Sequence, residues 1–266
     1  MTIKTFVFFD LETTGIPSKE NPAKITELTF VCVSRRDIEK ADLKKLPPVS
    51  KLSFLFNPQR EIKPEVVKLT GLSNSFLSNQ ALFGDKIECI NSFLDLPKPV
   101  CLVAHNGNRF DYKIIKSEYK NVNAELPKDL LCVDSLKAFK VILQDLSYSE
   151  NSNNRAISDS NNIELDDSSW PDLDVTPDDW KEIDNLIESF SKLTSTPNIK
   201  SKQTKPKMSY SLSNIYKMLL KKDPIVSHRA EADCMMLLEC VIATKAHFLE
   251  WADNNSELLS SIKPYN

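Results

Sequence analysis

Glycine is scarce in this sequence. The 266 residues include only four glycines, whereas glycine makes up about 7% of an average protein. Three of them, Gly15, Gly71 and Gly107, stand in the short segments ETTG, LTGL and HNG, which we expect to be loops. A chain with so little glycine places it where the backbone turns tightly or approaches a ligand. The three segments are therefore candidates for tight turns or for contact with a ligand.

Other absences exclude whole classes of protein. No apolar run approaches the roughly 20 residues needed to cross a bilayer, and the N-terminus has no cleavable signal pattern, so we expect no membrane contact. The six cysteines include no CxxC pair and lie in apolar or periodic segments. This pattern indicates buried, reduced thiols with neither disulfides nor a zinc site. These features favour a location in the cytoplasm or nucleus.

Charge of one sign is not in excess either. The formal net charge is -3, so the average composition gives no electrostatic signature of nucleic-acid binding, and any such activity has to come from a local patch. Hydrophobic residues make up 41% of the chain, which is enough for the core of a sizeable globular domain.

Strand-like and helix-like segments alternate along the first 143 residues, and helices follow near the C-terminus. Such an order predicts an α/β fold whose sheet is covered by helices on both faces. The expected strands are residues 5–9, 25–33, 51–57, 100–104 and 130–134. The expected helices are residues 81–94, 111–119, 135–141 with Ser135 as the cap, 211–220, 229–244 and 246–259.

An insert with a different composition separates these two parts. Residues 145–188 contain thirteen acidic and two basic residues. Within the insert we expect disorder at residues 149–162, a docked helix at residues 176–190, and a lysine-rich segment at residues 191–207. That last segment is either a solvated linker or a strand that contacts phosphate or directs nuclear import. The predicted organisation is one domain of residues 1–143 and 209–266, interrupted by residues 144–208.

Two carboxylates stand at the end of a buried strand in VFFDLETTG, where another apolar residue would be unremarkable. Asp10 and Glu12 are two positions apart, so they point to the same face of the strand. Acids held this close repel each other unless a cation lies between them, and Mg²⁺ prefers such oxygen ligands. Polar groups recur at later strand-to-helix junctions, at Asp111 and at the pair His228 and Asp233.

Taken singly, each of these later residues has an ordinary structural role. Asp111 could be a first-turn acid and His228 a neighbour of a helix cap. Together, four acids and one histidine at one sheet edge suit phosphodiester hydrolysis with two metal ions. In that chemistry one ion activates water, the other stabilises the leaving oxygen, and the histidine accepts the proton of the water.

At this point the motifs are recognisable. FDLETTG, AHNGNRFD and HRAEAD, in this order, resemble the three motifs of the DEDDh branch of 3′-to-5′ exonucleases. The segments LTGLS, LLCVDSL and YSLSNIYKMLL are similar to the three-prime repair exonuclease (TREX) family. The resemblance covers residues 1–143 and 209 to about 245. It implies an RNase H-like fold with a central mixed sheet of the five-stranded type, and removal of 5′-mononucleotides from DNA 3′ ends with two Mg²⁺ or Mn²⁺ ions.

The resemblance also implies roles for individual residues. Asp10, Glu12, Asp111 and Asp233 would ligate the metal ions, with Asp10 bridging both, and His228 would be the general base. The turn after the first motif would contact the terminal nucleotide, with Ile16 as a wedge between bases, and Leu69 and Phe110 would pack on the terminal base and sugar. The complete set of expected substrate-binding residues is Thr13, Thr14, Gly15, Ile16, Pro17, Leu69, Asn106, Arg109 and Phe110.

The resemblance also implies how the protein assembles. Members of the family are homodimers that pair at sheet edges, and the strand at residues 51–57 could supply that edge. The chain departs from the family in lacking a long hydrophobic C-terminal extension and a polyproline run, so we expect it to be untethered. It also carries the acidic insert, whose length exceeds that of the loop expected there.

Three alternatives remain open on the sequence alone. One is an exoribonuclease of the same superfamily, because metal ions and base do not touch the 2′-hydroxyl that distinguishes RNA from DNA. Another is a nucleic-acid or protein-binding module that has the fold without catalysis, against which stands the presence of all five catalytic residue types. In the third, the acids are only surface charge, which the apolar run before Asp10 makes difficult to sustain.

Overall fold

A mixed sheet of six strands runs through the centre of the protein. The computed structural model describes residues 1–17, 22–152, 209–224 and 228–265. Within these residues the strand order is β3-β2-β1-β4-β5-β6. β1 runs antiparallel to β2 and parallel to β4, β2–β3 and β5–β6 are antiparallel pairs, and β4–β5 is parallel. The strands are β1 (Thr5–Thr13), β2 (Ile25–Ser34), β3 (Ser50–Leu55), β4 (Val100–Ala104), β5 (Leu131–Asp134) and β6 (Glu257–Leu258).

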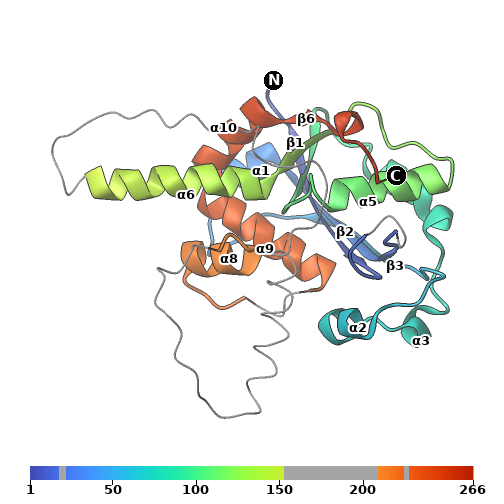
Figure 1. The fold of residues 1–266 in the computed structure, drawn as a ribbon. Coiled ribbons are helices and arrows are strands. Elements are labelled where there is room, and N and C mark those ends of the chain that lie inside the picture. The colour runs from blue at the N-terminus through green and yellow to red at the C-terminus, as the bar shows by residue number, and fades with distance from the viewer. Residues whose placement is uncertain (18–21, 153–208, 225–227, 266) are drawn as a thin grey trace, which may run out of the picture. The chain divides into compact units, whose positions relative to one another are not determined.

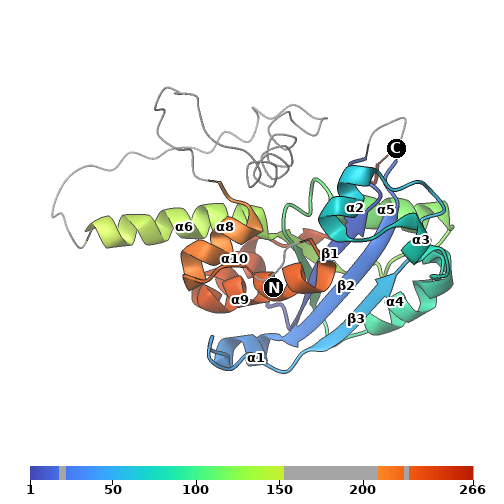
Figure 2. The same ribbon diagram turned by 90° about the horizontal axis from the view of Figure 1, so that it is seen from below.

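Helices cover both faces of this sheet. Figure 2 shows α6, α8, α9 and α10 on one side and α4 and α5 on the other, and Figure 1 shows α5, α6, α8, α9 and α10 from a second direction. The helices are α1 (Arg35–Lys40), α2 (Pro64–Thr70), α3 (Asn74–Leu77), α4 (Ile87–Phe93), α5 (Asp111–Asn121), α6 (Ser135–Ser152), α8 (Leu212–Leu220), α9 (Ala230–Ala243) and α10 (Lys245–Asn255), with short 3-10 turns η1 (Phe83–Lys86) and η4 (Leu259–Ser261).

The alternation of side chains along β1 is the reason that two cores form. Phe6 and Phe8 belong to the core that includes residues of α6, α8, α9 and α10. Val7 and Phe9 belong to the other core, with α4 and α5. All four side chains are fully buried, because successive residues of a strand point to opposite faces and both faces of this sheet are covered. β1 is therefore held from both sides along its length.

The predicted α/β architecture is confirmed, with corrections to the number and ends of the elements. A sixth strand, β6, adds two residues to the expected sheet. β1 continues through both acids to Thr13. It can do so because β2 offers antiparallel partners as far as Ile25. The segment predicted as one helix at residues 81–94 begins as the 3-10 turn η1, and the last predicted helix ends at Asn255.

The predicted end of the helix after β5 is wrong. α6 continues to Ser152, eleven residues past the predicted end, so the first four residues of the run 149–162 are helical. The predicted cap is also wrong: Asp134 Oδ1 accepts the N–H of Leu136 at 3.0 Å, and Ser135 is the first residue of the helix. The other expectations for the insert, at residues 153–162, 176–190 and 191–207, lie outside the described residues. Met1–Asn151 and Ser209–Asn266 form one compact unit.

The burial of the cysteines agrees with the sequence except at one position. All six are free thiols, five of them are buried, and Cys89 is exposed. In the part of the chain that the structure describes, no helix combines the length and apolar character that a membrane span requires.

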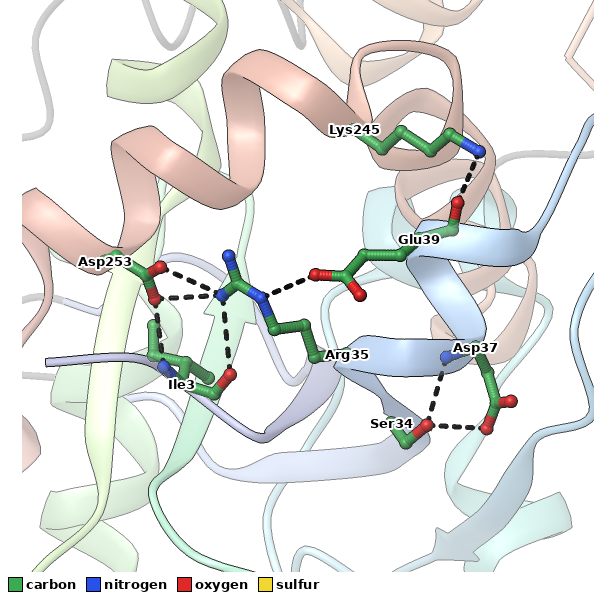
Figure 3. A network of polar contacts seen from close by, with 7 residues as sticks. All are labelled: Ile3, Ser34, Arg35, Asp37, Glu39, Lys245 and Asp253. Carbon is green, nitrogen blue, oxygen red and sulfur yellow. Dashed lines mark hydrogen bonds and ion pairs between the residues drawn. The ribbon is translucent and has the colours of Figure 1, made fainter.

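A network around Arg35 ties the N-terminal residues to two helices (Figure 3). The Arg35 guanidinium makes an ion pair with Asp253 of α10 at 3.0 Å and donates to the Ile3 carbonyl and to the carboxylate of Glu39. Lys245 Nζ donates to the Glu39 carbonyl at 2.8 Å. Since Thr5 pairs with Ser34 in the sheet, this network lies at the end of β1 opposite to its acids and fixes that strand at its start.

The core between α6 and α10 provides a test of stability. Phe139 is fully buried, and its ring centroid lies 5.8 Å from that of Phe248. Phe139→Ala should lower the free energy of unfolding by about 3–5 kcal/mol, because it removes apolar contacts and leaves a cavity. Phe76→Ala is the matched control, since Phe76 is 56% exposed. Urea denaturation of both variants gives the comparison, and equal losses would contradict the described packing.

Candidate active site

Three carboxylates from two elements meet beside the sheet. Asp10 and Glu12 of β1 and Asp233 of α9 each place one oxygen within 4.8 Å of the oxygens of the other two. The first two share a face because they lie two positions apart on a strand. The pairing register of β1 shifts between Glu12 and Thr13, and such irregularities bend a strand and redirect side chains near functional sites. The predicted convergence of these three acids is present.

The start of α9 brings Asp233 to the sheet. α9 packs over β1 and β2 with Cys234 fully buried, and the thiol of Cys234 lies 3.6 Å from the Thr29 carbonyl oxygen in β2. Asp233 is in the first turn. Its Oδ2 accepts the backbone N–H of His228 at 3.0 Å. The carboxylate is therefore held by its own helix and by the residue that the sequence predicts to be the general base.

Asp111 adds a fourth acid from the opposite helical layer. It is the first residue of α5 and only 3% exposed. The next residue, Tyr112, fixes the helix: its hydroxyl accepts the N–H of Ala104 at 2.9 Å and donates to the carbonyl of Val133 at 2.7 Å. Asp111 lies outside the group of three carboxylates described above. Its negative charge nevertheless raises the pKa of Asp10, so the two acids share one electrostatic environment.

Burial and mutual repulsion make these acids difficult to ionise together. Burial is the largest cause of the raised pKa of Asp10, followed by the charges of Asp111, Asp233 and Glu12. Burial also raises the pKa of Glu12 to about 8, with further contributions from Asp233 and Glu27. A shifted pKa of this kind reports the cost of placing uncompensated negative charge in the site.

Backbone donors relieve part of this repulsion. Burial raises the pKa of Asp111 to about 8, while the N–H groups of Asp111 and Leu11 oppose the rise. Burial raises the pKa of Asp233 to about 6, and the N–H groups of His228 and Arg229 oppose it. The smaller rise at Asp233 fits its smaller burial, because Asp233 is half-buried whereas Asp111 is only 3% exposed.

The donor set fits a hard divalent cation. Several oxygens of buried carboxylates converge, and the positive charge of Arg229 opposes the raised pKa of Glu12 without offsetting it. Mg²⁺ and Mn²⁺ take oxygen ligands of this type. Asp10, Glu12 and Asp233 could hold such an ion directly, and Asp111 is placed to contribute from the side of Asp10.

His228 stands two residues before the first residue of the helix that carries Asp233. The residue is half-buried and has a φ of 70°, which is uncommon for a residue other than glycine. Burial lowers the pKa of its imidazole, so the ring is neutral at neutral pH and able to accept a proton. The residue that precedes α9 is Arg229.

The turn after β1 is organised by its two threonines. Thr13 Oγ1 donates to the Gly15 carbonyl at 2.9 Å, and Thr14 Oγ1 accepts the N–H of Lys24 at 3.1 Å. Gly15 has a φ of 147°, a value that other residues rarely adopt. Ile16 and Pro17 follow and are half-buried. This turn continues directly from Glu12, which puts the expected substrate-contacting residues next to the acids.

A second turn leads into Asp111. Asn106 has a φ of 60°, and its N–H donates to Asp134 Oδ1 at 2.9 Å. Gly107 has no room for a side chain, because a Cβ there would come within 2.6 Å of the Tyr112 ring. The expected substrate residues Arg109, exposed, and Phe110, half-buried, complete this turn.

The remaining expected contact residue, Leu69, belongs to a separate part of the structure. It lies in α2 and is half-buried. α2 packs in a small apolar cluster around Ile62, Leu72 and Leu77, apart from the two main cores. Leu69 therefore stands on a different support from the two turns.

Comparisons with known proteins agree with this geometry. A sequence model of the exonuclease family matches residues 7–167, which is more than half of the chain. The chain belongs to the exonuclease family. It is 28% identical over 276 residues to three-prime repair exonuclease 1 of Bos taurus, covering 98% of this chain and 70% of that protein. It is 27% identical over 271 residues to three prime repair exonuclease 2 of Homo sapiens, covering 98% and 92%. The predicted 3′-to-5′ exonuclease of the TREX family is confirmed.

Solved structures of exonucleases share the fold. Escherichia coli exonuclease I in complex with a dT13 oligonucleotide aligns with a TM-score of 0.55 at 15% identity, over 94% of this chain and 43% of that chain. A 3′-exonuclease that recognises the histone mRNA stem-loop aligns with a TM-score of 0.53 at 10% identity, over 97% and 85%. These likenesses confirm the RNase H-like fold of this exonuclease.

The sequence interpretation missed two acids of the exonuclease site. Glu27, in β2, is 3% exposed and makes an ion pair with Arg229 at 2.9 Å. Asp134, at the end of β5, accepts the N–H groups of Asn106 and Asn108 and so holds the turn before Asp111. Like Asp10, each is an acid inside or at the end of an apolar strand. The same sequence pattern would therefore have identified both.

The raised pKa values predict how the metal-free exonuclease responds to pH. A folded-state pKa of about 8 for Glu12 and Asp111 lies above the usual values of 4.5 and 3.8. Between those values the folded chain binds more protons than the unfolded chain, so stability is full below the unfolded pKa and is lost as pH rises through about 8. In EDTA, the thermal midpoint should therefore fall as pH increases from about 5 to about 9.

Adding Mg²⁺ provides the matching measurement. The cation compensates the same negative charge as the protons, so it should raise the thermal midpoint more at about pH 9 than at about pH 5. Asp233→Asn is the control, because it removes one charge and should reduce both the pH dependence and the effect of Mg²⁺. A wild-type midpoint in EDTA that is no more sensitive to pH than that of the variant would contradict the electrostatic description.

Proposed function

We propose that this exonuclease hydrolyses DNA from single-stranded or frayed 3′ ends and releases 5′-mononucleotides with the help of two divalent cations, Mg²⁺ or Mn²⁺. The observation that carries the proposal is the convergence of Asp10, Glu12 and Asp233, with Asp111 beside Asp10 and His228 joined to Asp233. Two relatives named as repair exonucleases support DNA as the substrate.

Four acids would hold the cations. Asp10 would lie between the other ligands, because the charges of Asp111, Asp233 and Glu12 all act on it. Bound cations would supply the activation of a water molecule and stabilisation of the leaving oxygen. The residues of the chain fix the positions of these charges: β1 is buried on both faces, and α5 and α9 are each anchored by buried side chains.

His228 is proposed as the general base. Its imidazole is kept neutral by burial, which lowers its pKa, and a neutral imidazole can take the proton of the attacking water at neutral pH. The hydrogen bond from its N–H to Asp233 keeps the residue at the edge of the carboxylate cluster.

Substrate contacts are proposed for the two turns and α2. The turn at Thr13, Thr14, Gly15, Ile16 and Pro17 lies next to Glu12 and would meet the terminal nucleotide. The other proposed contacts are Leu69, Asn106, Arg109 and Phe110. Stacking on apolar and aromatic side chains tolerates any base, so we expect low sequence specificity.

Assembly and organisation remain part of the proposal. We infer a homodimer, and the position of β3 at the edge of the sheet supports pairing there. The exonuclease domain would comprise residues 1–143 and 209–266, with residues 144–208 as an insert. The location in cytoplasm or nucleus stays a prediction from the sequence.

A nuclease assay tests the reaction and its substrate together. A 5′-labelled single-stranded DNA and an RNA of the same sequence are incubated with the protein in Mg²⁺ and in EDTA. We expect a ladder of DNA shortened from its 3′ end in Mg²⁺, none in EDTA, and less shortening of RNA. A ladder on RNA alone would establish the exoribonuclease alternative, for which the histone mRNA exonuclease provides a neighbour in fold. No product from either strand would overturn the proposed function.

Two substitutions test the assigned roles. His228→Ala removes the proposed base and should lower kcat by about 10²–10⁴-fold, with the effect of Mg²⁺ on the thermal midpoint unchanged. Asp233→Asn should lower activity and also weaken that effect of Mg²⁺. Glu231→Gln, an acid of the same helix that is exposed and pairs with Lys51, is the control and should retain wild-type rates. A wild-type rate in His228→Ala would refute its role as the base.

A further inference from the structure

A buried carboxylate outside the predicted site receives three hydrogen bonds from one short segment. Glu27 accepts from Arg229 Nε and Nη2, each at 2.9 Å, and from the N–H of Ala230 at 3.2 Å. Glu27 is only 3% exposed and lies in β2 among buried residues. Two parallel hydrogen bonds from a guanidinium to a carboxylate fix both distance and orientation. Glu27 therefore determines where this segment lies on the sheet.

The segment that Glu27 holds connects the proposed base to a metal ligand. Arg229 follows His228 directly, and Ala230 is the first residue of α9, which carries Asp233. On the sheet side, Glu27 pairs with Glu12 in the register of β1 and β2. One ion pair thus joins the strand next to the acids with the residue next to the base.

We propose that Glu27 and Arg229 act as a pair of positioning residues that hold His228 in place for proton transfer. This inference rests on the proposed role of His228 as the base. Neither residue of the pair needs to touch the reacting atoms. The pair acts by fixing the backbone on the C-terminal side of His228, while the hydrogen bond from the His228 N–H to Asp233 fixes the residue itself.

The backbone of His228 shows why such an anchor is needed. Its φ of 70° is a left-handed conformation, which residues with a side chain adopt at a cost and keep only when their surroundings impose it. Without the ion pair, the segment before α9 would relax toward ordinary conformations, and the imidazole would leave its position. A displacement of about 1 Å at a catalytic group lowers the rate strongly.

A direct contact of Arg229 with substrate is the competing hypothesis. The Arg229 side chain is 46% exposed, and with Glu27, Lys86 and Gln80 it lines an open cavity of about 900 Å³. An arginine in such a place could bind a phosphate of the nucleic acid. The two hypotheses differ in kinetics, since a positioning pair affects kcat, whereas a phosphate contact affects KM.

A double-mutant cycle on the full chain tests the proposal. The variants are Glu27→Gln, Arg229→Gln and their combination, with kcat and KM measured on single-stranded DNA below the melting temperature of each. We expect each single variant to lower kcat by about 10–100-fold, as is typical when a partner that orients a site residue is lost, with KM within about twofold. The double variant should be no slower than the slower single variant, because both changes remove the same unit.

Hydrogen exchange gives a readout that is independent of turnover. Backbone amides of residues 228–233 should exchange faster in Arg229→Gln than in the wild type, because the anchor is lost. The matched control is Lys51→Gln, which breaks the other ion pair between the sheet and α9, Lys51 to Glu231 at 2.7 Å. The control should change neither kcat nor the exchange of these amides. Arg229→Gln keeps the test valid if Glu27→Gln does not fold.

Specific outcomes overturn the inference. An unchanged kcat in Arg229→Gln would show that the pair contributes only to stability. A raised KM with normal kcat in Arg229→Gln, and a normal Glu27→Gln, would show a substrate contact instead. Losses that multiply in the double variant would show that the two residues act separately. Inactive wild-type protein would instead refute the proposed function, and the exchange experiment would still report whether the pair anchors the segment.

Discussion

Electrostatic repulsion among buried carboxylates is the constraint on which the rest of this structure depends. Burial raises the pKa of Asp10, and the negative charges of Asp111, Asp233 and Glu12 raise it further. In such surroundings like charges cannot all be ionised without compensation. The compensation comes from several sources: backbone N–H groups at the starts of α5 and α9, the guanidinium of Arg229, and the cations that we propose to bind there.

A fold that tolerates this repulsion has to place its acids on rigid, well-packed secondary structure. β1 meets the need because apolar side chains on both faces bury it and neighbours on both sides hydrogen-bond to it. The Arg35 network fixes the start of the same strand, at the end opposite to the acids (Figure 3). The Tyr112 hydroxyl anchors α5 beneath the sheet. The rigid packing of the two cores thus keeps mutually repelling carboxylates close together. Active sites are commonly supported in this way.

The sequence predicts most of the fold because its strands and helices have strong local signals. The strand at residues 100–104 is found as predicted, since a short, continuous apolar run between turns is typical of a buried strand. Element ends are less accurate where local composition points the wrong way. β1 continues past Phe9 because β2 pairs with its polar end, and α6 continues past Val141 into a Ser- and Asn-rich run. β6 has two residues and depends entirely on its partner β5.

The sequence predicts the acids that converge in the site and the histidine proposed as its base, but not the contacts that hold them. Asp10 and Glu12 are recognisable because they interrupt an apolar pattern, and Glu27 and Asp134 interrupt theirs in the same way. The local sequence around such an acid does not reveal which distant residue it contacts. Glu27 pairs with a residue 202 positions away, and no periodicity or spacing encodes such a contact. Residues with an expected chemical role are therefore identified from the sequence, and residues whose role is to position others are overlooked.

Substrate choice has to reside outside the carboxylates and the histidine. In their proposed roles those groups would act on phosphate and water, which DNA and RNA share, and the 2′-hydroxyl that distinguishes the two polymers is not among the atoms that react. In the proposed function, discrimination would depend on the proposed substrate contacts: the turn at Thr13 to Pro17, Leu69 of α2, and Arg109 and Phe110. Most of these side chains are half-buried or exposed and stand on turns, although Phe110 packs against the core that includes α4 and α5. The same fold occurs in an exonuclease whose solved structure contains a DNA oligonucleotide and in one that recognises a histone mRNA stem-loop, so the fold alone does not select one of the two polymers.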